Sequence, residues 1–114
     1  MDSLGEVFQA LAHERRREMI HALALRPRSI SDLAAQQGLS LPAIHKHIRV
    51  LEDAGMVRRR KTGRTTFLAL RREPLGRLQD WVGQFHPEWG TDKESLANYA
   101  YHLEHHPTDP KEPA

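Results

Sequence analysis

Cysteine is absent from this chain of 114 residues. Its absence excludes a disulfide framework, a thiolate metal site and a cysteine nucleophile. No apolar run approaches the roughly 20 residues that a membrane-spanning helix needs. The acidic N-terminal stretch 1–6 has no basic segment followed by an apolar one, which is the pattern of a secretory signal. We therefore expect a cytoplasmic protein that does not enter a membrane.

Groups of residues suited to catalysis are also lacking. His13 next to Glu14, and His45 near His47, are the pairs that resemble acid–base partners. No nucleophile, glycine-rich phosphate loop or pair of carboxylates accompanies them. We predict that the chain is not an enzyme and uses no cofactor.

Hydrophobic residues make up 39% of the chain, which is enough for one modest core but not for two. We predict a single domain over residues 1–106. Residues 107–114 are expected to form a disordered tail.

The basic residues are concentrated in the middle of the chain. The formal net charge is only +2, but residues 41–72 contain nine basic and two acidic residues, and residues 73–114 contain three basic and eight acidic ones. A basic middle part followed by an acidic end favours a face that binds a polyanion. A solvated charged surface is the alternative, because basic runs are common.

Three helices are predicted in the first third of the chain. Apolar residues at helical spacing indicate helices over about 3–12 and 13–25. A short third helix begins at Ser29 or Ser31, since either hydroxyl can cap it, and ends at Gly38.

A fourth helix follows after a short turn. Ser40 can cap this helix, Pro42 lies in its first turn, where a missing N–H costs little, and Gly55 ends it. Its buried stripe comprises Ile44, Ile48 and Leu51. Its solvent face comprises Leu41, Pro42, His45, Lys46 and Arg49.

A β-hairpin is predicted next. The strand-like runs 56–61 and 64–70 flank Thr62-Gly63, which is typical of a two-residue turn. The consecutive basic residues 58–61 would keep an exposed strand edge from pairing with other chains.

Two further helices are predicted after Pro74. Apolar residues three and four apart form a seam on a fifth helix, which Pro87 and Gly90 break. The seam consists of Leu75, Leu78, Val82, Phe85 and Trp89. Thr91 with Glu94 forms a capping box for a sixth helix. The apolar residues of the sixth helix are Leu96, Tyr99 and Leu103.

This order of elements predicts a winged helix-turn-helix: a mainly α fold of five to six helices with a two-stranded β-hairpin as its wing. In that architecture the third helix braces the DNA backbone and the fourth presents side chains to the major groove. Lys46 and Arg49 can bind phosphate or guanine, and neutral His45 can donate or accept at a base edge. The alternative for this segment is an amphipathic helix whose outer face is merely solvated.

Residues 5–89 resemble the ArsR/SmtB family of bacterial winged-helix repressors. The most diagnostic stretch is His47–Val57, with the sequence HIRVLEDAGMV. The other matching segments are Ala10–Ile20, Ser29–Ala34, Ser40–Gly55 and the hairpin through Leu75. The resemblance implies a homodimeric repressor that binds an inverted-repeat operator in duplex DNA, often at its own promoter.

The resemblance also implies which residues bind DNA. Carried over by position, these are Ser40, Leu41, Pro42, His45, Lys46 and Arg49 on the fourth helix, and Lys61, Thr62 and Arg64 in the wing. His13-Glu14 stands where many relatives have Asp-Pro, and His45 stands where a Ser is usual, so the operator sequence stays open.

Dimerisation is expected through the first and last helices, which form the interface in that family. A monomer of this size would leave the apolar seam exposed. The predicted interface residues are Leu4, Val7, Phe8, Leu78, Val82, Phe85, Trp89, Leu96, Tyr99 and Leu103. An alternative is a ligand pocket between the dimer helices, lined by Trp81, Phe85, Trp89, Tyr99 and Tyr101.

Many members of the family sense metals, but the corresponding motifs are missing here. Ser31–Ala34 replaces any Cys-x-Cys, Asp80–Val82 lacks a histidine, and His102 is followed three residues later by His105 instead of Glu. We predict no metal site, and no small-molecule effector is evident. One alternative is a metal-responsive derepressor that uses His102, His105 and His106. The other is a winged-helix module that binds a partner protein.

Overall fold

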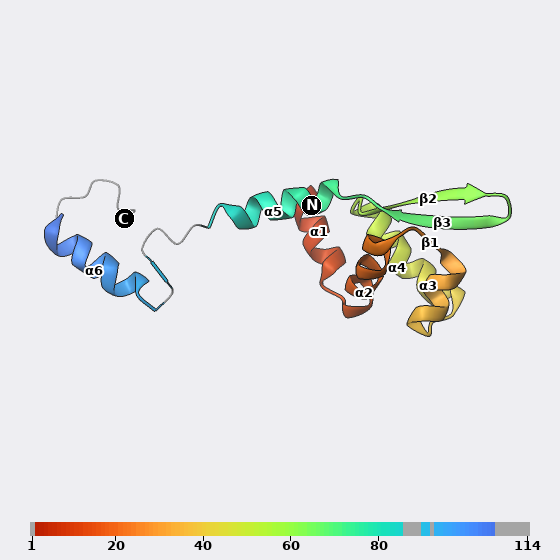
Figure 1. Ribbon diagram of the computed structural model, residues 1–114, viewed down its shortest axis with the longest axis horizontal. Coiled ribbons are helices and arrows are strands. Elements are labelled where there is room, and N and C mark those ends of the chain that lie inside the picture. Colours follow the sequence, from red (N-terminus) through yellow and green to blue (C-terminus); the bar gives the residue numbers. More distant parts are fainter. Residues whose placement is uncertain (1, 86–89, 92, 107–114) are drawn as a thin grey trace. The chain divides into compact units, whose positions relative to one another are not determined.

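Within the described residues 2–85, 90–91 and 93–106, the computed structural model contains six helices and three strands (Figure 1). The elements are α1 (Ser3–Leu11), α2 (Glu14–Leu25), β1 (Arg28–Ser29), α3 (Ile30–Gln37), α4 (Leu41–Asp53), β2 (Val57–Thr62), β3 (Thr65–Leu70), α5 (Glu73–Gly83) and α6 (Ser95–His105). The mainly α fold with a hairpin wing is the predicted one. The chain divides into two compact units, Met1–Val82 and Gly83–Ala114, and each is described by itself.

The first two helices begin at polar caps. The Asp2 carboxylate accepts a hydrogen bond from the Gly5 N–H at 2.6 Å, and His13 Nδ1 accepts one from the Arg15 N–H at 3.1 Å. Each cap satisfies a backbone donor that has no partner inside its helix. Extended backbone at Arg26 ends α2 just before a proline, as predicted.

The helix-turn-helix is built from α3 and α4. Ser29, and not Ser31, caps α3, because its hydroxyl accepts the Asp32 N–H at 3.1 Å. Gly38 then adopts a φ of 64°, a left-handed conformation that favours glycine. Ser40 caps α4 through a hydrogen bond from the Ala43 N–H at 3.3 Å. The caps and the turn of this motif therefore follow from local sequence.

The sheet has three antiparallel strands in the order β1-β3-β2. The two-residue strand β1 was not predicted, since it is too short to show a periodic pattern. The predicted turn at Thr62-Gly63 was wrong by one residue. Thr62 pairs with Thr65, which leaves Gly63 and Arg64 as the loop, with a φ of 64° at Gly63. A positive φ at the first loop residue alone is typical of a type II′ hairpin turn.

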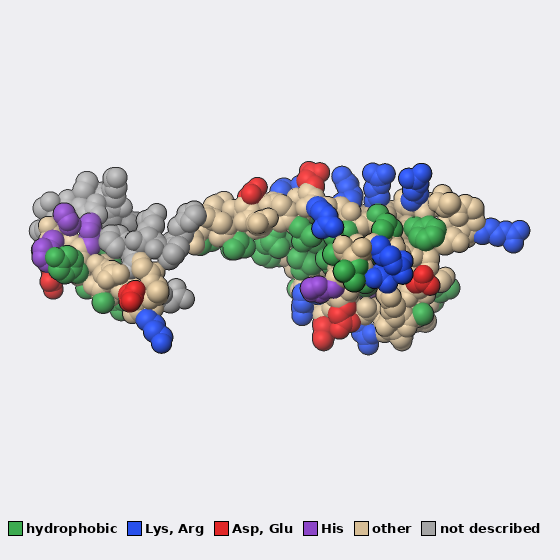
Figure 2. Space-filling model, in the orientation of Figure 1, with side chains coloured by type: hydrophobic (Ala, Val, Ile, Leu, Met, Phe, Trp, Pro, Cys, Tyr) green, Lys and Arg blue, Asp and Glu red, His purple; other side chains and the backbone are tan. Residues whose placement is uncertain are grey.

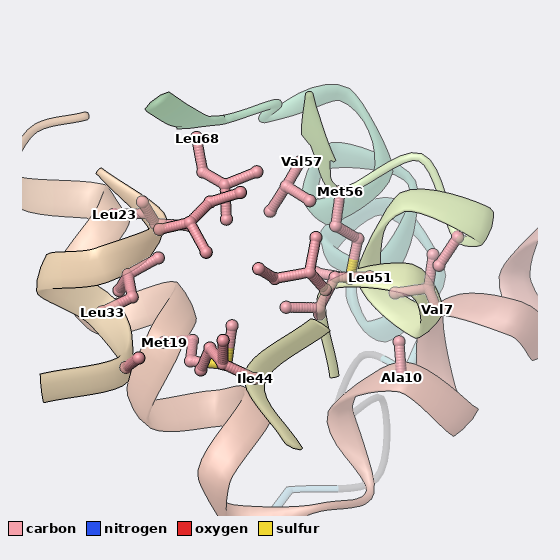
Figure 3. Close-up of a cluster of buried hydrophobic side chains, with 14 residues drawn as sticks. Val7, Ala10, Met19, Leu23, Leu33, Ile44, Leu51, Met56, Val57 and Leu68 are labelled. Atoms are coloured by element: carbon pink, nitrogen blue, oxygen red, sulfur yellow. The ribbon is translucent and has the colours of Figure 1, made fainter. Parts of the chain in front are cut away.

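The core lies between the helices and the inner face of the sheet (Figure 3). Met19 of α2 lies beside Ile44 of α4, while Val57 and Leu68 enter from the sheet. Burying each such side chain contributes roughly 1.5–3 kcal/mol relative to leaving it exposed. The predicted stripe of α4 is confirmed: Ile44, Ile48 and Leu51 are fully buried. This anchoring determines which face of α4 remains at the surface.

The last two helices are shorter than predicted. α5 ends at Gly83, so Phe85 lies beyond it, and Trp89 lies outside the described residues. The Thr91 N–H reaches the Glu94 carboxylate at 3.5 Å, but α6 itself begins only at Ser95. The predicted tail 107–114 also lies outside the described residues. Across the part of the chain that is described, no helix is both long and apolar enough to cross a membrane.

Candidate nucleic-acid interface

The outer face of α4 carries the side chains predicted to bind DNA. Leu41 is 51% exposed, and Pro42, Lys46 and Arg49 are also exposed, whereas His45 is half-buried. The buried residues Ile44, Ile48 and Leu51 occupy the opposite face. The first turn of α4 contains no acidic residue. No carboxylate there offsets the positive end of the helix dipole, which favours a phosphate nearby. The first-turn backbone donors after Leu41 are already used, because Pro42 has no N–H and Ala43 and Ile44 donate to Ser40.

The hairpin supplies a second basic element. Lys61, Thr62 and Arg64 are all exposed at or next to the turn between β2 and β3. Figure 2 shows a Lys or Arg side chain projecting from the tip of the hairpin and others gathered around its base. Within the described residues, the charged groups of Lys46, Arg49, Lys61 and Arg64 form no ion pair or hydrogen bond. These cations are available to an outside partner.

Other arginines bind the ends of helices. Their guanidinium groups donate to backbone carbonyls in the last turns of α1, α2 and α3, where the i→i−4 pattern of backbone hydrogen bonds ends. The donors are Arg16 to Gln9 and Ala10, Arg17 to Leu11, Arg28 to Ala22, Arg72 to Ala24 and Arg15 to Gln37. The sequence did not distinguish these structural arginines from the surface ones, because the carbonyls they reach belong to other elements.

His47 lies at the inner edge of α4, beside the start of α2. Its ring centroid is 4.7 Å from that of His13, and its Nδ1 is 3.4 Å from the Arg16 guanidinium. Burial lowers the pKa of His47 below its ordinary value, and the neighbouring His13, Arg16 and Arg15 lower this pKa further. The lowered pKa favours the neutral form of the His47 ring, which packs against His13 just before α2.

An exposed apolar face runs over α1 and α5. Phe8 is 42% exposed and Trp81 is 40% exposed, and their rings meet edge to face with centroids 5.3 Å apart. Val82 is 55% exposed, and Leu4 and Leu78 are half-buried. Val7, also predicted for the dimer interface, is instead fully buried in the core of its own chain.

The second unit carries the remaining residues predicted for dimerisation. On α6, Leu96 and Leu103 are exposed and Tyr99 is half-buried. The Tyr101 and His105 rings stack with centroids 3.9 Å apart, and His105 Nδ1 lies 2.8 Å from the Tyr101 carbonyl. Among the described residues, no three His, Asp or Glu side chains are grouped to hold a metal ion.

The family follows from sequence and structure comparisons. Residues 13–59 match the family described as bacterial regulatory protein, arsR family. A crystal structure of an ArsR family transcriptional regulator is 36% identical, covers 72% of this chain and 84% of that chain, and superposes with a TM-score of 0.67. The chain belongs to the arsR family. Its relatives are transcriptional regulators, not enzymes.

Two further relatives of this arsR-family chain bear on its function. The HTH-type transcriptional regulator KmtR from Mycobacterium tuberculosis is 37% identical over 73 residues, which are 64% of this chain and 56% of that protein. A possible ArsR-family regulator from Mycobacterium bovis, solved as a homodimeric winged helix-turn-helix DNA-binding domain, is 26% identical. It covers 92% of this chain and 85% of that chain, with a TM-score of 0.63. This chain spans about half the length of the curated relatives it matches.

Two basic residues of the wing were missed as site candidates. Arg58 and Arg60 lie on β2, on the side of the sheet opposite the buried Val57. Their guanidinium groups have no partner in the part of the chain that the structure describes. The alternation of side chains along a strand was the available signal, because it separates residues 58 and 60 from residue 59.

Proposed function

We propose that this arsR-family chain is a transcriptional repressor that acts in the cytoplasm, where it binds an inverted-repeat operator as a homodimer. The observation that carries the proposal is a core-anchored helix, α4, whose exposed cations have no partner within the described residues. The wing adds further unpaired cations. Partnerless basic side chains on two adjacent elements are suited to the phosphates of a duplex.

Each element has its own part in binding. α4 enters the major groove, where Lys46 and Arg49 bind phosphate or guanine and His45 contacts a base edge. Ser40, Leu41 and Pro42 bring the start of the helix against the DNA. The hairpin tip, with Lys61, Thr62 and Arg64, reaches the neighbouring minor groove.

The homodimer buries the apolar face of α1 and α5, since Phe8, Trp81 and Val82 remain accessible on the single chain. Phe85, Trp89 and the α6 residues Leu96, Tyr99 and Leu103 extend this interface in the proposal. A two-fold dimer places its two α4 helices about 34 Å apart, one turn of DNA, which requires an inverted repeat. Occupying such an operator blocks access of the polymerase, including at the gene's own promoter.

The test measures binding of the full chain to duplex from the gene's own upstream region and to a scrambled duplex, across salt concentrations. We expect a preference of about a thousandfold or more for the upstream duplex, together with a steep loss of affinity as salt rises. Lys46→Ala with Arg49→Ala should lower both the affinity and the steepness of the salt dependence. Lys93→Ala, which removes one exposed cation from the other unit, is the control and should leave both nearly unchanged.

Other outcomes would favour other functions. Weak and equal binding to both duplexes would favour a module that binds a partner protein. Loss of DNA affinity on adding Zn²⁺, restored when His102 and His105 are replaced, would favour a metal-responsive derepressor.

A further inference from the structure

A pocket lies on the face of the wing sheet that points away from the core. Its volume is about 390 Å³, within the range of sites for small molecules. Successive side chains of a strand point to opposite faces, and Val57 and Leu68 point into the core. Their neighbours Arg58, Phe67 and Ala69 therefore face outward into the pocket.

Arginines surround this pocket. Arg58 pairs across the strands with Ala69, and Arg60 pairs with Phe67, so both arginines line the pocket on the same face of the sheet as these apolar residues. Neither guanidinium has an ion pair or hydrogen bond with any described residue. Arg71 lines the same pocket and lies 3.8 Å from the exposed Glu73, an ion pair that contributes little.

Apart from Thr62, the rest of the pocket lining is apolar. Phe67, Ala69 and Leu70 come from β3, and Pro27 comes from the connection between α2 and β1. Phe67 and Ala69 are only half-buried, so their apolar surface remains for a ligand to cover. Leu70 lies opposite Val57 and packs against the core. A DNA phosphate backbone would satisfy the arginines but leave this apolar surface uncovered. A small molecule with an acidic group and an apolar body would satisfy both.

We propose that this wing-sheet pocket binds a small organic anion, namely a carboxylate or phosphate attached to an aromatic or aliphatic body. The acidic group accepts hydrogen bonds from Arg58 and Arg60, whose planar guanidinium groups suit both kinds of oxyanion. The apolar body covers Phe67 and Ala69. Because the pocket joins the α2–β1 connection to both strands of the hairpin, the bound anion neutralises and stiffens the wing. This second site goes beyond the proposed DNA binding and does not depend on it.

The test is titration of the full chain with phenyl phosphate in the absence of DNA. Binding is measured by calorimetry and by changes in the backbone amide NMR signals. Inorganic phosphate and phenol are titrated in parallel. We expect saturable binding of phenyl phosphate, about tenfold or more tighter than either, with signal changes concentrated in β2, β3 and Arg28, whose amide follows Pro27. A factor of ten is the size expected from one charge-assisted hydrogen bond.

Two matched variants separate the pocket from the general charge of the wing. Arg58→Gln with Arg60→Gln should weaken phenyl phosphate binding about tenfold or more. Lys61→Gln with Arg64→Gln removes the same charge from the same hairpin but outside the pocket. This control should change the affinity for phenyl phosphate less than about twofold. Phe67→Thr, which keeps a strand-forming residue, should reduce phenyl phosphate binding to the level of inorganic phosphate. Unfolding curves check that each variant folds.

Three results would overturn the proposal. Absence of saturable binding to the folded wild-type chain is the first. Equal weakening by the two double variants would show that only net charge matters. Signal changes centred on α4 and the hairpin tip would place the anion on the proposed DNA face instead.

Discussion

Three consecutive arginines occur twice in this chain, at residues 15–17 on α2 and at residues 58–60 on β2, and the two triplets serve different purposes. On α2, all three guanidinium groups reach backbone carbonyls in the last turns of α1 and α3. On β2, Arg59 pairs with Glu52 of α4 at 2.9 Å, while Arg58 and Arg60 face outward with no partner among the described residues. The same tripeptide thus stabilises the fold in one place and offers charge to a ligand in the other.

The reason is the surroundings of each triplet. The start of α2 follows directly on the end of α1, where unpaired carbonyls are within reach of long donors. A strand sends alternate side chains to opposite faces, so β2 turns only its middle arginine toward α4. The tripeptide is identical in both places, and the acceptors around it decide which role its guanidinium groups have.

The largest predicted effect is on stability. Arg16→Ala should lower the free energy of unfolding by about 1–3 kcal/mol, because it leaves the Ala10 carbonyl without its side-chain donor and removes one of the two donors to the Gln9 carbonyl. Arg60→Ala, which removes an arginine from the other triplet, should stay within about 0.5 kcal/mol of the wild type. Urea unfolding of both variants measures the difference, and equal losses would contradict the contrast between the triplets.

The next effect is on DNA binding. Lys61→Gln with Arg64→Gln should make the dependence of log affinity on log salt shallower by about two, one for each phosphate that these cations no longer neutralise. Arg17→Gln removes a cation that is already bound to the Leu11 carbonyl and should leave that slope unchanged. Titration of a labelled duplex at several salt concentrations checks both. A similar change of slope in both proteins would mean that α2 contributes to the DNA face.

A smaller effect concerns Arg59. Glu52→Gln breaks its ion pair, which is partly exposed, so the loss of stability should not exceed about 1 kcal/mol. Asp53→Asn removes the same charge from an exposed neighbour and serves as the control. A double-mutant cycle with Arg59→Gln measures the coupling between the two side chains. A coupling near zero would mean that Arg59 is as available to partners as Arg58 and Arg60.

The smallest predicted effect is a dependence of stability on pH. It arises at His47 of α4, which lies beside the α2 triplet and has no counterpart at the β2 triplet. The pKa of His47 is lowered by burial and by His13, Arg16 and Arg15, so the folded chain binds its proton less readily than the unfolded chain does. The stability that His47 contributes is therefore complete above the unfolded pKa near 6.5 and is lost as pH falls through the lower folded pKa.

Thermal unfolding between pH 8 and pH 5 measures this dependence. His47→Gln should flatten the fall in stability over that window, whereas replacing the exposed His21 should not. A wild-type chain that is equally stable at both ends of the range would rule out the effect.

Much of the helix-turn-helix was predictable because its signals are local. The Ser40 cap, the left-handed Gly38 and the buried stripe of α4 each depend on residues within a few positions of one another. The cap of α3 needed the structure to choose Ser29 over Ser31, since both hydroxyls stand where a helix can begin. The hairpin was predicted as an element, but its turn was displaced by one residue.

The remaining features depend on partners far away in the sequence. β1 exists because Arg28 and Ser29 pair with Leu68 and Phe67 of β3, and two residues carry no periodic pattern of their own. The early end of α5 at Gly83 was likewise missed, because apolar spacing alone predicted a helix as far as Trp89.

By itself, the sequence determined where most helices begin and which face of α4 is buried, since caps, glycines and apolar periodicity act within one element. It also determined the resemblance to the arsR family. Only the tertiary structure decided which arginines are bound to carbonyls and which remain available. It also decided that Val7 belongs to the core and that a pocket forms on the wing sheet. Hydrogen-bond partners and burial are properties of surroundings that distant segments build together, and no single stretch of sequence contains them.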